Sequence, residues 1–303
     1  MVYLTAALCC SALIAIMMRL GEHRIKNNIS VLAVNYLICL ILSLAYTIAA
    51  TGAGETGTGS FIVHSADGRE TQLMGLVNGF FYVGGFILYQ YNIRKNGVTM
   101  SATFMKLGVL VPTLTAIIVF GERPGRLQIC GIILAVAAIL VLNLSGKYGK
   151  SGKTDKTDSS KSSDITVTTP KALIALLLMG GSGDAMSKIY EELGSSDLNE
   201  HFLLYTFISA IILCTMAAVW SRQGLTRDDV LFGCLIGIPN FYTARFLLAA
   251  LAYVPAVIVY PTYSTGTIIL VSIAGVLIFH EKITPKQKTA ILMIITALIL
   301  LNL

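Results

Sequence analysis

A stretch of about 25 residues that occurs twice decides the fold of this chain. Residues 120–144 read FGERPGRLQICGIILAVAAILVLNL, and residues 279–303 read FHEKITPKQKTAILMIITALILLNL. In this register, which runs without a gap, the matching positions are Glu122 with Glu281, Gln128 with Gln287, Ala138 with Ala297, and 142–144 with 301–303. Apolar residues alone could match by chance, but shared Glu, Gln and Asn residues would rarely do so. The sequence therefore predicts an internal repeat.

Apolar blocks of roughly 20 residues contain this repeat and continue on either side of it, and a helix of that length crosses the hydrocarbon layer of a membrane. Strands of a membrane barrel would instead alternate over about ten residues. The blocks are Val2–Leu20, Ile29–Ala50, Leu73–Tyr91, Val98–Phe120, Leu127–Leu144, Ala172–Leu193, Phe202–Trp220, Val230–Leu251, Ala256–Phe279 and Gln287–Leu303. We therefore predict an all-α membrane protein with ten transmembrane helices.

The composition of the whole chain supports the same class. The 303 residues are 55% hydrophobic and 13% charged, whereas soluble domains average about 25% charged residues. The net charge of +6 comes from basic residues that lie between the apolar blocks. These features exclude a soluble enzyme, a nucleic-acid-binding protein and a secreted disulfide scaffold, and they make the lipid bilayer the expected partner.

Cysteine and histidine give no sign of a metal or redox site. All six cysteines fall inside apolar blocks without a CxxC pair, and the four histidines stand singly at the ends of blocks. We interpret the cysteines as small apolar packing residues. The sequence predicts no metal site, no cofactor and no catalytic residue.

Residues 147–170 separate the fifth block from the sixth and are rich in Lys, Ser, Thr, Asp and Gly. Such a segment buries too little apolar area to offset the entropy of ordering it, so we predict a flexible linker. It divides the chain into five-helix repeats at 1–146 and 171–303. Because five is odd, the second repeat must cross the membrane in the opposite direction. Inverted repeats of this kind are typical of secondary transporters, whose substrate site lies near the midplane.

The distribution of basic residues predicts the orientation in the cell membrane. Loops after odd-numbered blocks, the linker included, hold 16 of the 22 lysines and arginines, and loops after even-numbered blocks hold 4. Basic loops stay in the cytoplasm. The count therefore places the linker 147–170 in the cytoplasm and both termini outside it.

Short motifs in the repeat resemble the drug/metabolite transporter superfamily, in particular its EamA-type ten-span branch. The matching residues are Gly121-Glu-Arg123, Gln128-Ile-Cys-Gly131 and Ala252-Tyr-Val-Pro-Ala256. The second copy keeps Glu281 and Gln287 but has Ala290 in place of the glycine. The resemblance covers the full chain and implies a ten-span secondary transporter. Members usually place both termini in the cytoplasm, which differs from the charge count, and here we follow the charges.

Ionisable side chains inside the predicted spans are Lys106, Asp184, Lys188 and Arg245. A charge at bilayer depth costs a few kcal/mol and normally faces a cavity or a partner. Lys188 follows Asp184 by one helical turn, on the same face. We interpret Asp184, with Lys188, as the coupling site that binds a proton or a cation. The alternatives are an internal ion pair of Asp184 with Lys188 or Lys106, and a Lys188 side chain that extends to the membrane surface.

The three basic residues give an excess of positive charge that an anionic group of the substrate would relieve. We therefore expect Lys106 and Arg245 to bind an anionic or zwitterionic metabolite, with the arginine forming two parallel hydrogen bonds. Polar and aromatic residues at similar depth are predicted to complete the site, namely Asn78, Tyr82, Asn240, Tyr242, Tyr260 and Tyr263. The alternative for each is hydrogen bonding between helices or at the membrane surface.

These features together predict a secondary transporter of a small organic metabolite that works by alternating access. No GxxxxGK[ST] nucleotide-binding loop is present, so proton coupling or substrate exchange is expected in place of ATP hydrolysis. The alternatives are an exporter of cationic or lipophilic compounds and a membrane-embedded enzyme without a recognisable catalytic motif. We predict that the protein is not an enzyme.

Overall fold

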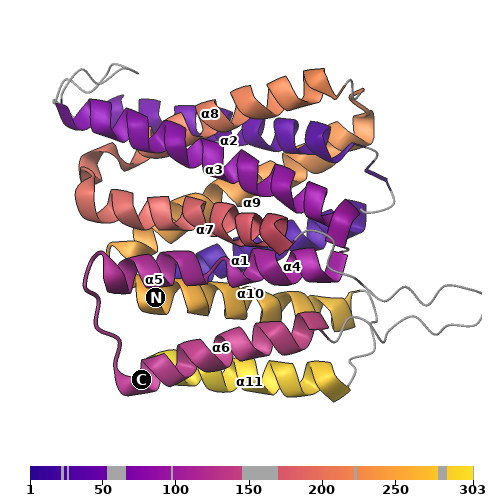
Figure 1. The fold of residues 1–303 in the computed structure, drawn as a ribbon. Coiled ribbons are helices and arrows are strands. Elements are labelled where there is room, and N and C mark those ends of the chain that lie inside the picture. The colour runs from indigo at the N-terminus through magenta and orange to yellow at the C-terminus, as the bar shows by residue number, and fades with distance from the viewer. Residues whose placement is uncertain are drawn as a thin grey trace, which may run out of the picture.

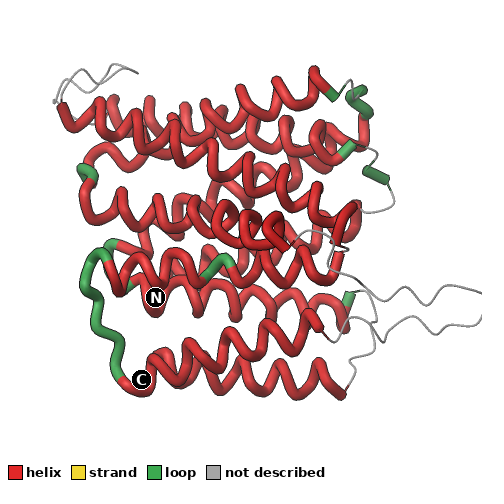
Figure 2. The backbone as a smooth tube through the Cα atoms, in the orientation of Figure 1, coloured by secondary structure: helices red, strands yellow, loops and turns green. Residues whose placement is uncertain are grey.

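The computed structural model of the chain describes residues 1–21, 24–25, 27–52, 66–96, 98–144, 170–221, 224–278 and 285–302. Within these residues all regular structure is helical (Figure 2). The elements are α1 (Val2–Gly21), α2 (Asn28–Gly52), α3 (Ala66–Asn96), α4 (Val98–Leu107), α5 (Leu110–Ile118), α6 (Arg126–Leu144), α7 (Pro170–Leu193), the short helix η2 (Ser196–Leu198), α8 (Asn199–Trp220), α9 (Arg227–Leu251), α10 (Ala256–Leu277) and α11 (Pro285–Asn302). The predicted linker 147–170 lies outside the described residues, except for Pro170, which begins α7.

The helices confirm an all-α, multi-pass membrane protein. Six described segments are long and apolar enough to cross a membrane: Asn28–Ala49, Asp67–Tyr89, Lys171–Leu193, Ser196–Trp220, Arg227–Leu251 and Ala256–Leu277. The remaining predicted blocks contain shorter apolar helical stretches, at Val2–Met18, Phe104–Ile118, Arg126–Val141 and Ile291–Leu301.

Packing between helices joins the first half of the chain to the second. The long helices run back and forth side by side (Figure 1). α2 packs on α9 and α3 packs on α8, while α1 packs on α9 and α3 packs on α7. Helix α1 also contacts α10, and α4 and α5 contact α7; α6 pairs with α11. These contacts come in equivalent pairs when each helix is replaced by the helix at the same position in the other half. The α2–α9 contact then corresponds to α3–α8, α1–α9 corresponds to α3–α7, and α1–α10 corresponds to the contacts of α4 and α5 with α7. The α6–α11 contact corresponds to itself.

The fourth predicted span is two helices instead of one. A turn at Gly108 and Val109 separates α4 from α5. Pro112 has no N–H, so the carbonyl of Gly108 lacks its helical partner four residues on. That carbonyl accepts from the N–H of Val111 at 3.0 Å instead, and the backbone tightens locally. The break therefore follows from a proline inside an apolar block.

Paired glycines bring helices of opposite halves into close contact. Gly75 and Gly79 of α3 face the backbone of α8. Gly233 and Gly237 of α9 face α2, where a methyl group added at Gly237 would lie 2.7 Å from Cβ of Ile38. Small residues four apart are a common way for membrane helices to approach closely. The two pairs make equivalent contacts in the two halves.

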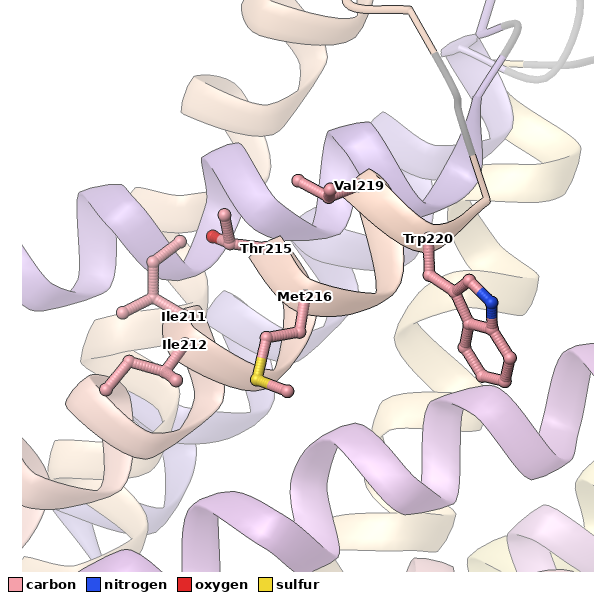
Figure 3. A pocket seen from close by; sticks show the side chains of 6 residues that line it. All are labelled: Ile211, Ile212, Thr215, Met216, Val219 and Trp220. Atoms are coloured by element: carbon pink, nitrogen blue, oxygen red, sulfur yellow. The ribbon is translucent and has the colours of Figure 1, made fainter.

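The outer surface carries many exposed apolar side chains, as contact with lipid requires. Trp220, at the end of α8, is 90% exposed. Figure 3 shows a shallow hollow on the same helix, lined by Ile211, Ile212, Thr215, Met216, Val219 and Trp220. All of these residues come from α8, and none is charged. The hollow is therefore part of the apolar face of α8 rather than a site built by several helices.

Candidate functional site

A cavity of about 260 Å³ lies between the two halves of the chain and contains a carboxylate. The first half contributes Tyr36 from α2, Phe81, Tyr82, Gly85 and Phe86 from α3, and Met105 from α4. The second half contributes Gly180, Gly183 and Asp184 from α7, Asn240, Thr243, Ala244 and Leu247 from α9, and Tyr263 from α10. Asp184 is the charged residue among these described lining residues.

Glycines position Asp184 by allowing α7 to approach its neighbours. A methyl group added at Gly85 of α3 would lie 3.2 Å from Cα of Gly180, so the two helices touch through their backbones. One added at Gly183 would lie 3.0 Å from the ring of Tyr82. On another side, the hydroxyl of Tyr260 in α10 donates a hydrogen bond to the main-chain carbonyl of Asp184 at 2.5 Å. These contacts hold the segment of α7 that carries the carboxylate.

Among the described basic residues predicted for the site, Lys106 is the one that interacts electrostatically with Asp184. It ends α4, one residue before the break, and its side chain is exposed. No direct ion pair between Lys106 and Asp184 occurs in the described part of the chain. Lys106 therefore interacts with the carboxylate without a direct ion pair, and it is not among the residues that line the cavity.

Arg245 lies away from the central cavity and has a partner of its own. Its Nε and Nη2 atoms are each 2.8 Å from Oε1 of Glu200, and its guanidinium lies 4.1 Å from the ring centre of Tyr46. It lines a separate hollow of about 240 Å³ that includes Glu200 and Tyr3. The positive charge of Arg245 is thus already balanced by a carboxylate and a ring face.

Lys188 belongs to a group of charged residues that we call the Glu122 cluster, consisting of Glu122, Lys188, Glu191 and Glu192. The ammonium of Lys188 lies 3.0 Å from Glu122, 3.0 Å from Glu191 and 2.6 Å from Glu192, and its side chain is only 3% exposed. In the structure described it pairs with these three carboxylates and not with Asp184. Its surroundings are those of a structural ion-pair network.

Glu122 also binds the first turn of α10. Its carboxylate oxygens accept hydrogen bonds from the main-chain N–H groups of Ala256 at 3.1 Å and Val257 at 3.0 Å. An anion at a helix N-terminus satisfies N–H groups that have no partner within the helix. The preceding Gly121 has a φ of 67°, which glycine adopts without strain and other residues rarely adopt. The Gly-Glu motif thus turns the chain and presents the carboxylate to α10, whereas Glu281 of the second copy lies outside the described residues.

The polar residues predicted for the site divide into two groups. Tyr82, Asn240 and Tyr263 line the central cavity. The others form hydrogen bonds between helices: the amide of Asn78 donates to Oγ1 of Thr206 at 3.3 Å, the hydroxyls of Tyr242 and Tyr46 are 3.2 Å apart, and Tyr260 holds α7 as described. Asn240 also donates to Oδ1 of Asn35 at 3.2 Å.

Sequence reasoning missed the lining residues Phe81, Phe86 and Met105. Two signals could have identified the phenylalanines. Phe86 follows Tyr82 by four residues and so lies on the same helix face. Phe81 neighbours Tyr82 within the same apolar block.

Comparison with known proteins gives a family and a fold. The model of the EamA-like transporter family matches residues 1–144 and 170–303. An uncharacterized protein of Haemophilus influenzae is 21% identical over 298 residues, which cover 96% of this chain and 94% of the relative. A crystal structure of a protein that is 14% identical superposes with a TM-score of 0.73 and covers 99% of this chain and 94% of that one. This last likeness concerns the fold alone.

Proposed function

The chain belongs to the EamA-like transporter family, and we propose that it is a secondary transporter that carries a small organic metabolite by alternating access through the cavity around Asp184. One observation carries this proposal. Both family-matched halves contribute to the wall of a single cavity, and that wall contains a carboxylate. A site between halves that can move relative to each other is the arrangement that alternating access requires.

The proposal includes ten membrane spans arranged as two inverted repeats, 1–146 and 171–303, joined by the linker 147–170. Three observations support it. The same family model matches each half, the sequence repeats in one register, and the helix contacts are equivalent when the halves are exchanged. The fourth span of the first half would then consist of α4 and α5 with their break near the cavity.

The ion pairs in the structure indicate which charge the substrate carries. The preference for an anionic or zwitterionic substrate rested on excess cations, but Arg245 is paired with Glu200 and Lys188 with three glutamates. Lys106 and Asp184 remain, one positive and one negative. A zwitterion could interact with both, whereas an anion would face the carboxylate in the cavity wall. We therefore favour a zwitterionic substrate over an anionic one, with Asp184 as the residue that exchanges a proton or a substrate.

Exchange in liposomes tests the transport proposal. Purified protein in liposomes loaded with a small zwitterionic metabolite is expected to take up the labelled compound from outside well above the uptake of protein-free liposomes. A screen of metabolites for those that raise the unfolding temperature of the purified protein selects the compounds, because a ligand that binds the folded state stabilises it. Stabilisation by a compound that is never exchanged would contradict transport.

Orientation is proposed from the charge count, with both termini outside the cytoplasm and the linker inside. A reporter that is active only outside the cytoplasm is expected to be active when fused after Leu303 and inactive when inserted within 147–169. The same insertions with a reporter that needs the cytoplasm should give the reverse pattern. Cytoplasmic activity at Leu303 would overturn the charge-based orientation and agree with the usual arrangement of the superfamily.

A further inference from the structure

The wall of the central cavity combines one carboxylate with several aromatic rings. The described rings are those of Tyr36, Phe81, Tyr82, Phe86 and Tyr263, and they come from three helices of both halves. The faces of such rings attract organic cations, and the attraction increases when water is excluded. A carboxylate adds a charge-assisted hydrogen bond to an ammonium group. This combination suits a positively charged nitrogen better than any anion.

Neighbouring cations that could oppose this preference are bound to carboxylates. The side chain of Lys188, one turn from Asp184 along α7, has three glutamate partners. Arg245 has Glu200 and the ring of Tyr46. Because these positive charges are balanced where they lie, they contribute little net field at the cavity. Lys106 is the described cation that acts on Asp184.

Lys106 is placed to act as an internal substitute for a bound cation. It follows Met105, which lines the cavity, and α4 packs on α7, the helix that carries Asp184. Lys106 and Asp184 interact electrostatically, yet the described residues show no direct ion pair between them. An exposed lysine side chain is long and can turn away when another cation arrives. The cost of an uncompensated carboxylate inside the membrane is thereby avoided both with and without substrate.

We propose that Asp184 and the surrounding rings form a binding site for the ammonium group of a compact organic amine, and that Lys106 is a tethered counter-ion which the substrate ammonium displaces. The inference rests on the proposed transport function and specifies which end of the substrate the cavity recognises. A zwitterion places its ammonium at Asp184 and leaves its carboxylate for the displaced Lys106. The cavity of about 260 Å³ lies slightly below the usual range of roughly 300–1,000 Å³ for drug-sized ligands, which suits a small amine.

Three compounds with the same branched body test the site, because they differ only in their charged groups. Isoamylamine carries the ammonium alone, leucine carries both groups, and isocaproate carries the carboxylate alone. Binding is measured as the rise in unfolding temperature of the full-length protein in detergent. Isoamylamine and leucine are expected to stabilise the wild-type protein, and isocaproate is expected to have no effect. Stabilisation by isocaproate as large as that by isoamylamine, or none by isoamylamine, would overturn the ammonium site.

Substitutions then assign the roles of the two residues. Asp184→Asn is expected to weaken isoamylamine binding about tenfold or more, because it removes the charged partner, while Asp184→Glu should retain binding. Lys106→Ala is expected to tighten isoamylamine binding by about three- to tenfold, because the competing cation is gone. A merely structural lysine would not give this gain, and weaker amine binding in Lys106→Ala would overturn the counter-ion role.

Matched controls and a second readout separate this inference from the transport proposal. Asp228→Asn and Lys171→Ala alter exposed residues at the starts of α9 and α7 and should leave binding unchanged. The unfolding temperatures without ligand show which variants are folded. The expected binding pattern without exchange in liposomes supports the ammonium site and contradicts transport. Exchange of isocaproate that survives Asp184→Asn supports transport and overturns the ammonium site.

Discussion

Asparagine in place of Asp184 is expected to reduce substrate exchange in liposomes by about 30-fold or more, because loss of one partner of a desolvated charge pair costs roughly 2–5 kcal/mol. Asp184 is the charged group in the described wall of the cavity. The substitution preserves the size of the side chain and leaves the main-chain carbonyl that holds Tyr260. The expected loss is therefore one of substrate recognition or coupling and not of folding.

Control variants and unfolding temperatures separate a loss of substrate recognition or coupling from a loss of folding. Asp228→Asn removes an exposed carboxylate from the first turn of α9 and should exchange substrate at the wild-type rate. Equal unfolding temperatures for wild type and Asp184→Asn would show that the structure is intact. If Asp184→Asn exchanged substrate as fast as wild type while driven by a pH gradient, neither substrate binding nor proton coupling could depend on this carboxylate.

Methionine in place of Lys188 is expected to lower the free energy of unfolding by about 3–5 kcal/mol, the usual cost of leaving buried charges without their partner. The ammonium of Lys188 is almost completely buried between three carboxylates. Removing it places Glu122, Glu191 and Glu192 near one another with no cation between them. Methionine preserves most of the volume, so the loss is electrostatic. Denaturant unfolding in detergent, followed by circular dichroism, measures the effect.

A control and a double variant make the test specific. Lys171→Met removes an exposed lysine from the start of α7 and should leave stability within about 0.5 kcal/mol of wild type. Adding Glu122→Gln to Lys188→Met should recover part of the loss, because one of the repelling carboxylates is gone. A Lys188→Met protein as stable as wild type would show that the Glu122 cluster contributes nothing to the fold.

Local sequence patterns were sufficient to predict the helical elements. Every predicted apolar block is mostly helical over its described residues, because a membrane span must satisfy its own backbone hydrogen bonds and so needs a long apolar run. The break between α4 and α5 was missed although Pro112 is visible in the sequence. Two further signals were available and unused: Gly75 with Gly79, and Gly233 with Gly237, mark the surfaces where the halves approach each other.

The site was harder to predict than the helices, because the balance of charges around it depends on residues that lie far apart in the chain. Asp184 was expected at depth and does line the central cavity. Arg245 was expected there too, but its partner Glu200 lies 45 residues earlier, at the start of α8. Glu122 reaches α10 across 134 residues. Spacing along one helix can show which residues share a face, but it cannot show which distant carboxylate neutralises a given cation.

The Glu122 cluster has a consequence for the movement that the proposed function requires. It connects the loop after α5 to the end of α7 and to the first turn of α10, one helical turn from Asp184. Hydrogen-bonded charges therefore link these three segments to one another. Charged groups that separate into water recover much of their lost interaction through hydration. We expect such a link to hold one conformation firmly while it is dry, and to separate with a small net change in free energy once water enters.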